Sequence, residues 1–268
     1  MAAPKTRQAS GGERLHKVLA RAGWGSRREI ERWIQEGRVR VNGRRAELGA
    51  QVGPGDRVQL DDGRNLRVSG GMPELHVLAY NKPAGEVCSR SDEQGRPNIF
   101  AHLPRIERGR WINIGRLDIN TSGLLLFTNH GELAHRMMHP RYRVDREYAV
   151  RIFGTVEDEM LARLRAGVDI EGERFHFNDI VVGAGDGANH WYYCVVQSGR
   201  QREVRRLWES QGVQVSRLMR VRFGNIMLPT DLRGGYAVEI GGALRDELCA
   251  LVGLDPQGAA LATTTRRA

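Results

Sequence analysis

The chain has 268 residues, 40% of them hydrophobic, so it can bury a full core and can hold a small module beside a larger domain. It has 41 Lys and Arg against 32 Asp and Glu, and the formal charge of +9 favours a polyanionic partner. Residues 1–70 hold 15 Lys and Arg against 8 Asp and Glu, a net of +7, which is typical of an RNA- or DNA-binding module joined to a nearly balanced domain.

Several classes of protein are disfavoured at once. Cys88, Cys194 and Cys249 lie far apart without a CxxC pair, so we expect free thiols in a reducing compartment, not a disulfide framework or a zinc ribbon. The first residues contain no apolar stretch, and no window approaches eighteen apolar residues. We therefore expect neither a secretory signal nor a membrane span, and a cytoplasmic protein. Residues 1–12 and 256–268 are polar and aperiodic, so we expect them to be disordered.

Two short helices are predicted directly after the N-terminal tail. Apolar residues recur at helical spacing in RLHKVLARAG, and Gly23 marks the end of that helix. The next segment, GSRREIERWIQEG, opens with Ser26 followed three residues later by Glu29, which is the pattern of a capping box. Its apolar stripe continues to Gly37, where we expect the second helix to end.

A small β element follows these helices. Valines alternate with arginines in RVRVNGRR, and the pair Asn42-Gly43 predicts a tight hairpin turn. The segment DRVQL predicts a further strand after the turn at residues 53–55. A linker rich in Gly and Arg then marks a domain boundary near residue 70.

Cations gather on the outer face of the first helix and at the start of the second, where backbone amides also attract phosphate. These candidate RNA contacts are Arg14, Lys17, Arg21, Arg27 and Arg28. The alternative interpretation is a charged face that is only solvated.

Beyond residue 70, short strands alternate with turn signals and few long helices. The expected strands are HVLAYNK, WINIG, LLLFT, REYAVRIFG, HWYYCVVQ and YAVEI, and the expected helices are EDEMLARLRAG and REVRRLWESQG. This order predicts an α+β domain on a largely antiparallel mixed sheet. A GxGxxG sequence after a strand and a Walker sequence are both missing, so nucleotide-cofactor chemistry has no support.

One carboxylate stands out within GRLDINTSGLLLFTNHG. Asp118 lies on a loop between a strand that stops at Gly115 and an apolar strand that begins near Leu124. A loop held by rigid elements on both sides is the usual setting for a catalytic group. The alternative is that the Asp118 side chain caps the NTSG turn through an Asx-type hydrogen bond.

The order of parts over residues 13–60 resembles the S4 RNA-binding domain. The stretch GRLDINTSGLLLFTNHGELA resembles the signature of pseudouridine synthases, in the branch that includes the ribosomal small-subunit enzyme A and large-subunit enzymes B, E and F. YNKPAGEVCSR, REYAVRIFG and SGRQREVRRLWESQG also fit, in order. The resemblance implies an S4 domain with its linker over residues 13–70 and a pseudouridine synthase domain with a central cleft over 71–255.

The resemblance implies roles for three residues. Asp118 would be the essential carboxylate, and Arg205 the cation that keeps it ionised. Tyr148 would stack on the uracil that is flipped out of the RNA. The alternatives are a phosphate-binding or surface role for Arg205 and a half-buried strand position for Tyr148. Converting uridine to pseudouridine is an isomerisation with no net gain or loss of atoms or electrons, so we expect no cofactor and no metal.

Weaker candidates surround this core. Arg116 could fill the gap left by the flipped base or hold a phosphate, and Arg200 and Arg202 could contact phosphates. We expect Lys82 to act at its strand end more than in catalysis. Trp191, Tyr192 and Tyr193 could stack on RNA, although a buried strand is favoured. Three histidines invite a metal site, which we disfavour because HExxH is missing: His130, His135 and His139.

The sequence therefore predicts a monomeric rRNA pseudouridine synthase whose substrate is a 23S rRNA hairpin or a large-subunit assembly intermediate. Modification of 16S rRNA or of another 23S site is the alternative within the class. A non-catalytic S4-type assembly factor is a rival from another class, and the GRLD, REY and REVRR stretches argue against it. A nucleoside hydrolase would need paired carboxylates or a metal-binding acid cluster, and Asp118 stands alone.

Overall fold

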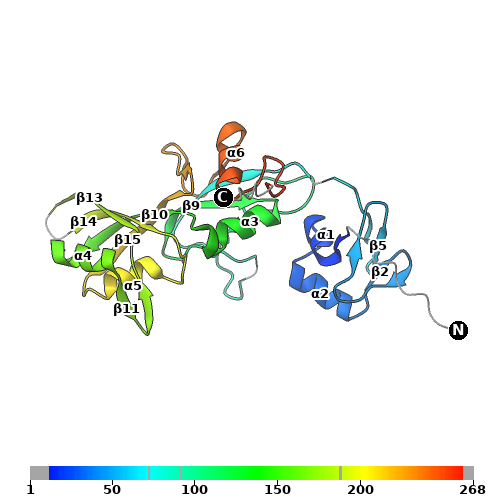
Figure 1. Ribbon diagram of the computed structural model, residues 1–268, viewed down its shortest axis with the longest axis horizontal. Helices are drawn as coiled ribbons and strands as arrows, with labels where there is room; N and C mark the ends of the chain where they lie inside the picture. Colours follow the sequence, from blue (N-terminus) through cyan, green and yellow to red (C-terminus); the bar gives the residue numbers. More distant parts are fainter. Residues whose placement is uncertain (1–11, 72, 91, 187–188, 262–268) are drawn as a thin grey trace, which may run out of the picture. The chain divides into compact units, whose positions relative to one another are not determined.

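The computed structural model describes residues 12–71, 73–90, 92–186 and 189–261. The chain forms two compact units (Figure 1). Unit 1 is the N-terminal part through Glu74 together with Ile106–Arg110, and unit 2 is Leu75–Arg105 with the chain from Trp111 onward. The units separate a few residues after the expected boundary. Val68 is buried in the core of unit 1 and its backbone pairs with Gly55 and Asp56, so the chain belongs to unit 1 at least as far as this residue.

The terminal segments that were expected to be disordered are only partly described. Residues 1–11 and 262–268 lie outside the described residues. Residues 256–261 form a turn in which Ala260 bridges to Leu254, and the amide of Leu261 donates to the carbonyl of Gly253. Residues 256–261 therefore fold back on the residues just before them, Gly253 and Leu254.

In its described residues, unit 1 contains two short helices and two small sheets. Its elements are β1 (Glu13–Arg14), α1 (Leu15–Arg21), α2 (Arg27–Gln35), β2 (Val39–Val41), β3 (Arg44–Arg45), β4 (Gln51–Val52), β5 (Arg57–Leu60) and β6 (Asn65–Arg67). Strands β1 and β4 pair, and the larger sheet has the order β3-β2-β5-β6.

Local sequence signals explain the start of α2 and the first hairpin. The Ser26 hydroxyl accepts from the Glu29 amide at 3.1 Å, and the Glu29 carboxylate accepts from the Ser26 amide at 3.2 Å, so the predicted capping box is present. Asn42 and Gly43 both have positive φ, as a tight turn between β2 and β3 requires. The core of unit 1 packs both helices on the sheet through Leu15, Ile30 and Trp33, among others.

Unit 2 is built on one large sheet. Its strands are β7 (Val77–Lys82), β8 (Ile112–Ile114), β9 (Ser122–Thr128), β10 (Arg146–Phe153), β11 (Val168–Ile170), β12 (Glu173–Phe175), β13 (Asp179–Asp186), β14 (Asn189–Val196), β15 (Gln214–Phe223), β16 (Ile226–Met227) and β17 (Ala237–Glu239). Its helices are α3 (Gly131–Met138), a 3-10 turn (Pro140–Tyr142), α4 (Asp158–Ala166), α5 (Glu203–Glu209) and α6 (Gly242–Leu251).

Within the described part of the chain, the sheet has nine strands in the order β13-β14-β10-β15-β9-β7-β17, with β16 on β15 and β8 on β9. The pair β15 and β9 is parallel, and the other pairs are antiparallel. The predicted α+β class on a largely antiparallel mixed sheet is confirmed. Two apolar cores support it: one packs α3 and α6 on β7 and β9, and the other packs α4 and α5 on β10 and β14.

Among the elements of unit 2 that were not expected from the sequence are α3, α6, β13 and β15. Helix α3 is capped by the imidazole of His130, and α6 follows Gly241 without any side-chain cap, so neither start carries the usual Ser, Thr, Asp or Asn signal. Strand β13 is interrupted by glycines, and β15 buries Arg220 where an apolar residue would be expected. Each of these elements depends on tertiary packing more than on local pattern.

Candidate active site

The loop from Gly115 to Thr121 joins β8 to β9 and carries Asp118. The amide of Thr121 donates to the backbone carbonyl of Asp118 at 3.0 Å, so main-chain atoms close this turn. Among the residues that the structure describes, no hydrogen bond or ion pair uses the half-buried Asp118 carboxylate. The side chain is therefore not used as an Asx cap, and its oxygens remain available to a substrate.

Lys82, at the end of β7, supports this loop through hydrogen bonds to its backbone. Its side chain is fully buried. The ammonium donates to the carbonyls of Pro83 at 2.9 Å, Thr121 at 3.0 Å, Asp118 at 3.3 Å and Ile119 at 3.4 Å. Burial lowers the pKa of Lys82, and the neighbouring Cys88, Glu86 and Asp118 oppose that shift. The sequence assigned Lys82 a strand-end role, and the structure specifies it as a cation coordinated by the backbone of the Asp118 loop.

The chain that follows Lys82 fastens the other side of the same loop. The thiol of Cys88 donates to the carbonyl of Leu117 at 3.3 Å and accepts from the Leu117 amide at 3.4 Å. The amide of Gly85 donates to the carbonyl of Ile119 at 2.7 Å. The backbone of the loop is thus held by residues 82–88 at four positions, which are Leu117, Asp118, Ile119 and Thr121.

Arg205 approaches the loop from α5. Its guanidinium is buried and donates to the carbonyl of Asn120 at 3.3 Å and of Val215 at 3.2 Å. Burial and the charge of Arg202 lower the pKa of Arg205, whereas the charge of Asp118 raises it. Arg205 and Asp118 therefore lie within electrostatic range. Both are described residues, and they form no ion pair within 4.0 Å. The direct contact of Arg205 is with the loop backbone.

Tyr148 is brought to the loop by strand register. On β10 it lies opposite Arg220 of β15, and Arg220 lies opposite Gly123 of β9. The Tyr148 side chain is half-buried and packs against the apolar core under α5. Since neighbouring strands are about 4.8 Å apart, Tyr148 lies roughly 10 Å from the start of β9, which directly follows the Asp118 loop.

Gly123 permits this register. A Cβ atom at this position would lie 2.3 Å from the Arg220 carbonyl oxygen, and its φ is +101°. The motif glycine is therefore required where β9 and β15 approach each other. Arg220 itself is buried and donates from Nε to the carbonyl of Leu124 at 2.7 Å. Sequence reasoning did not single out Arg220; the signal was an arginine at an inward position of the alternating segment QVSRLMRVRF.

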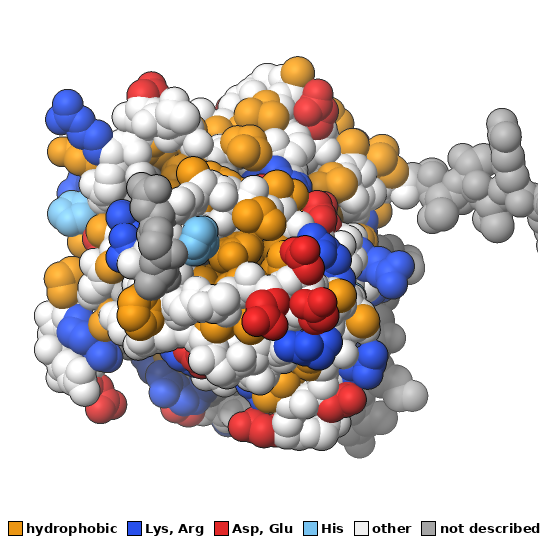
Figure 2. Space-filling model, turned by 90° about the vertical axis from the view of Figure 1, so that its left-hand side faces the viewer, with side chains coloured by type: hydrophobic (Ala, Val, Ile, Leu, Met, Phe, Trp, Pro, Cys, Tyr) orange, Lys and Arg blue, Asp and Glu red, His pale blue; other side chains and the backbone are white. Residues whose placement is uncertain are grey.

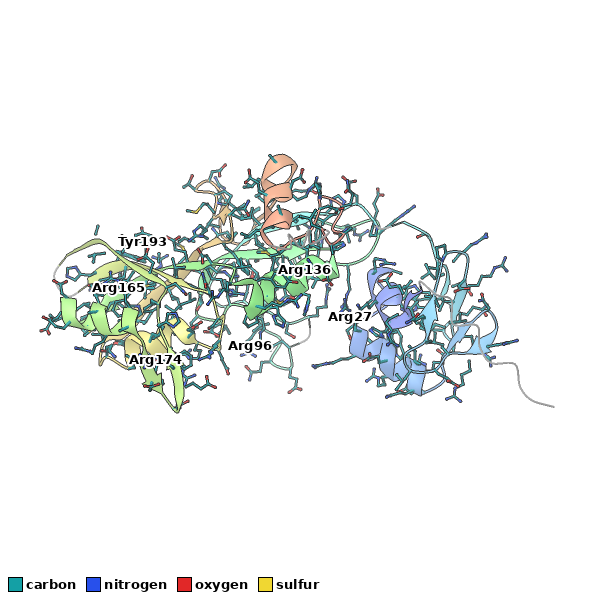
Figure 3. The ribbon with its side chains drawn as sticks, in the orientation of Figure 1. Arg27, Arg96, Arg136, Arg165, Arg174 and Tyr193 are labelled. Atoms are coloured by element: carbon teal, nitrogen blue, oxygen red, sulfur yellow. The ribbon has the colours of Figure 1, made fainter. Side chains whose placement is uncertain are left out.

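The candidate RNA-binding cations differ in whether they already form ion pairs with acidic residues. Arg116, Arg14, Lys17, Arg27 and Arg28 are exposed, and Figure 3 labels Arg27 at the start of α2. Arg21 pairs with Glu13 at 2.6 Å. Arg200 and Arg202 pair with Glu173 at 3.4 Å and with Glu209 at 3.8 Å. These pairs would have to open if the three arginines contact phosphate.

The three histidines serve the local fold. His130 accepts from the Leu133 amide at the start of α3, and His139 accepts from the Arg141 amide at the next turn. His135 packs edge-on against His139. Within the described ranges, no group of three His, Cys, Asp or Glu side chains could hold a metal ion, and no helix is both long and apolar enough to cross a membrane.

Comparison with known proteins agrees with this geometry. Residues 76–210 match the model of the RNA pseudouridylate synthase family, and residues 13–58 match that of the S4 domain. A relative from Pseudomonas aeruginosa, named ribosomal large subunit pseudouridine synthase B, is 54% identical over 96% of this chain and 67% of its own length. Relatives of the same name from Haemophilus influenzae and Escherichia coli strain K12 are 55% and 50% identical, over 84% and 91% of this chain and 64% and 85% of their own lengths.

The chain thus spans about two thirds of the length of the Pseudomonas and Haemophilus relatives. A solved structure described as a pseudouridylate synthase is 27% identical, covers 89% of this chain and 99% of its own, and superposes with a TM-score of 0.60. These matches span both the S4 unit and the unit that holds Asp118. The chain belongs to the RNA pseudouridylate synthase family.

Proposed function

We propose that this protein isomerises uridine to pseudouridine at a specific site in 23S rRNA, with Asp118 as the essential carboxylate. One observation carries the proposal: Asp118 lies on a loop whose backbone is held by Lys82, Cys88 and Arg205, while its carboxylate has no partner in the described chain. A rigidly held and unused carboxylate is suited to act on a substrate.

The reaction breaks the bond between C1′ of the ribose and N1 of uracil, turns the base, and joins C1′ to C5. Asp118 would either add to the nucleotide or accept a proton from the ribose while the base is detached. Every atom of the substrate remains in the product except the proton lost from C5, which is replaced at N1. The chain therefore needs a carboxylate, a site for the flipped base and a proton acceptor at C5.

Arg205 and Tyr148 are the side chains best placed to support Asp118. A carboxylate in a water-poor site tends to take up a proton, and the charge of Arg205 opposes this. The ring of Tyr148 would stack on the flipped uracil, and its hydroxyl would serve the proton transfer. Arg116, exposed and two residues before Asp118, would contact the RNA from which the base is taken.

The names of the relatives favour large-subunit rRNA as the substrate. The S4 unit, with its exposed cations on α1 and α2, would grip the phosphates of a 23S rRNA hairpin or of an assembling large subunit. Action as a monomer in the cytoplasm is part of the same proposal. Modification of 16S rRNA or of a different 23S site is the alternative.

Mapping pseudouridine in rRNA tests the proposal. RNA from cells with the gene, without it, and with the Asp118→Asn variant is treated with carbodiimide, and reverse-transcription stops are compared. We expect one stop in 23S rRNA that is lost in the second and third samples. A stop lost from 16S rRNA would favour the alternative substrate, and an unchanged map would reject the proposed activity.

A further inference from the structure

One end of the large sheet has an uncovered face. At the strands β13, β14, β10 and β15, the helices α4 and α5 and the hairpin β11–β12 all lie on one side (Figure 1). Val150 and Tyr192 point to that side and are buried there. Because side chains alternate along a strand, their neighbours in sequence point to the opposite side. In Figure 3, Tyr193 lies on that opposite side, away from Arg165 of α4 and Arg174 of β12.

Two cross-strand rows define this face, which we call the Tyr193 face. In one row Val181, Tyr193, Ala149 and Met219 lie side by side on β13, β14, β10 and β15. In the next row are Trp191, Arg151 and Arg217.

Several of these side chains are exposed, although Ala149 is buried between its neighbours at 3%. Tyr193 is 40% exposed and Val181 53%, and Phe153 at the end of β10 is 52% exposed. Figure 2, which views the molecule from the end that carries β13 and β14, shows hydrophobic side chains among charged side chains of both signs on the surface. The sequence favoured a buried strand for residues 191–193, and this is wrong for Tyr193.

The cations of this face are not neutralised. Arg151 donates to the Ser216 hydroxyl at 3.0 Å, and neither Arg151 nor Arg217 forms an ion pair within the described chain. The acids lie in a separate row with Asp179 and Glu147. There Glu147 is already paired with Arg222 at 2.7 Å.

This combination fits one partner chemistry. Arg151 lies between Trp191 and Arg217 on this face, and two adjacent arginines without an acidic partner, in a chain of formal charge +9, favour a polyanion. Aromatic rings beside unpaired arginines suit single-stranded RNA, whose bases stack on rings while its phosphates meet the cations. An open sheet face with exposed aromatics is a known platform for such binding.

We propose that the Tyr193 face binds a single-stranded segment of the RNA substrate, with a base stacked on Tyr193 and phosphates held by Arg151 and Arg217. This inference rests on the proposed function only in taking RNA as the substrate. The face lies on the side of the sheet opposite to α5 and Arg205, so it is a second contact that extends the RNA footprint beyond the modified nucleotide.

The test uses the full chain and a 20-nucleotide oligouridine that contains 4-thiouridine. Tyr193→Ser should weaken binding about fivefold or more, as loss of a stacking platform does. Arg217→Ala should reduce the slope of log K against log salt by about 0.7, the value for one phosphate of a single strand. Photo-crosslinks in the wild type should include β14.

Matched controls are exposed residues elsewhere. Tyr236→Ser removes a tyrosine that is 63% exposed on a different segment, and Arg163→Ala removes an arginine of α4 on the opposite side of the sheet. Neither should change affinity or salt slope as the Tyr193 face variants do. Pseudouridine formation should be unchanged in Tyr236→Ser and Arg163→Ala, because neither residue belongs to the Tyr193 face or forms a side-chain hydrogen bond with the Asp118 loop.

Two results would overturn the inference. One is the absence of crosslinks in β14. The other is that Tyr193→Ser and Arg217→Ala bind the RNA as tightly as the control variants do. Either result would favour a protein as the partner of this face. Failure of the proposed function is distinguishable, since it would abolish pseudouridine formation by the wild type while leaving the crosslinks intact.

Discussion

Replacing Lys82 with Met should separate the holding of the Asp118 loop from the binding of RNA. The substitution keeps much of the buried volume and removes three N–H donors that serve four backbone carbonyls, those of Pro83, Asp118, Ile119 and Thr121. A hydrogen bond from a charged group contributes about 1.5–3 kcal/mol, so three contribute roughly 5–9 kcal/mol. These values are net of desolvation, so Lys82→Met should lose about 5 kcal/mol or more of folding free energy.

The catalytic effect should be larger than the loss of stability suggests. A carboxylate displaced by about 1 Å loses on the order of 10²-fold in rate. We therefore expect a 10²-fold lower single-turnover rate for Lys82→Met, measured as tritium release from 5-³H-uridine RNA, with RNA affinity changed less than about threefold. Urea unfolding gives the stability, and the exposed Lys17→Met variant is its control. A rate within threefold of wild type would refute the role of Lys82.

The contribution of Lys82 to the stability of the fold should also depend on pH. Burial lowers its pKa below the ordinary 10.5, so the unfolded chain binds more protons than the folded chain between the two values. In that alkaline window the stability of the wild type should rise with pH relative to Lys82→Met. A difference that is flat or falls with pH would contradict the assignment of the buried cation.

Three further predictions follow from the same contacts. Gly123→Ala should destabilise the fold by more than about 3 kcal/mol in urea unfolding, because its Cβ would meet the Arg220 carbonyl. The control is Gly115→Ala, where φ is also positive but the space is open, and which should cost only about 1–2 kcal/mol. Equal costs would disprove the close approach of β9 and β15. Arg205→Met should slow catalysis severely, because it removes the cation that donates to the carbonyl of Asn120 in the Asp118 loop, and Arg205→Lys should recover part of the rate. A rate of Arg205→Met within threefold of wild type would make Arg205 a surface or phosphate contact. The double variant Arg27→Ala and Arg28→Ala should flatten the slope of log K against log salt by about 1.8 for duplex RNA while the rate at saturating RNA persists, and an unchanged slope would remove α2 from the RNA contact.

Local chemistry made part of the fold predictable. The Ser26 and Glu29 capping box and the Asn42-Gly43 turn each involve residues within four positions of one another, and both appear as expected. Helix α6 lacks such a signal, since Gly241 precedes it without a side-chain cap, and its formation depends on packing of Leu248 and Cys249 against β7 and β9.

The support of the active site was harder to predict because it is non-local. The motif identified Asp118, but the four carbonyls around Lys82 come from segments some 36–39 residues away as well as from its neighbour. Arg220 contacts Leu124 across 96 residues, through a parallel register that a single sequence does not reveal. Arg205 illustrates the limit in detail: its position on α5 was expected, whereas its direct contact with the carbonyl of Asn120 was not.

The most direct test of the whole account is the single-turnover rate of pseudouridine formation by Asp118→Asn on an rRNA fragment that the wild type modifies. The amide keeps the shape of the side chain and removes its charge. RNA affinity should therefore stay within a few-fold of wild type, and the urea midpoint within a few tenths molar. We expect the rate to fall by about 10⁴-fold or more, as loss of an essential carboxylate does. A rate above about a tenth of wild type would show that the chemistry does not pass through Asp118.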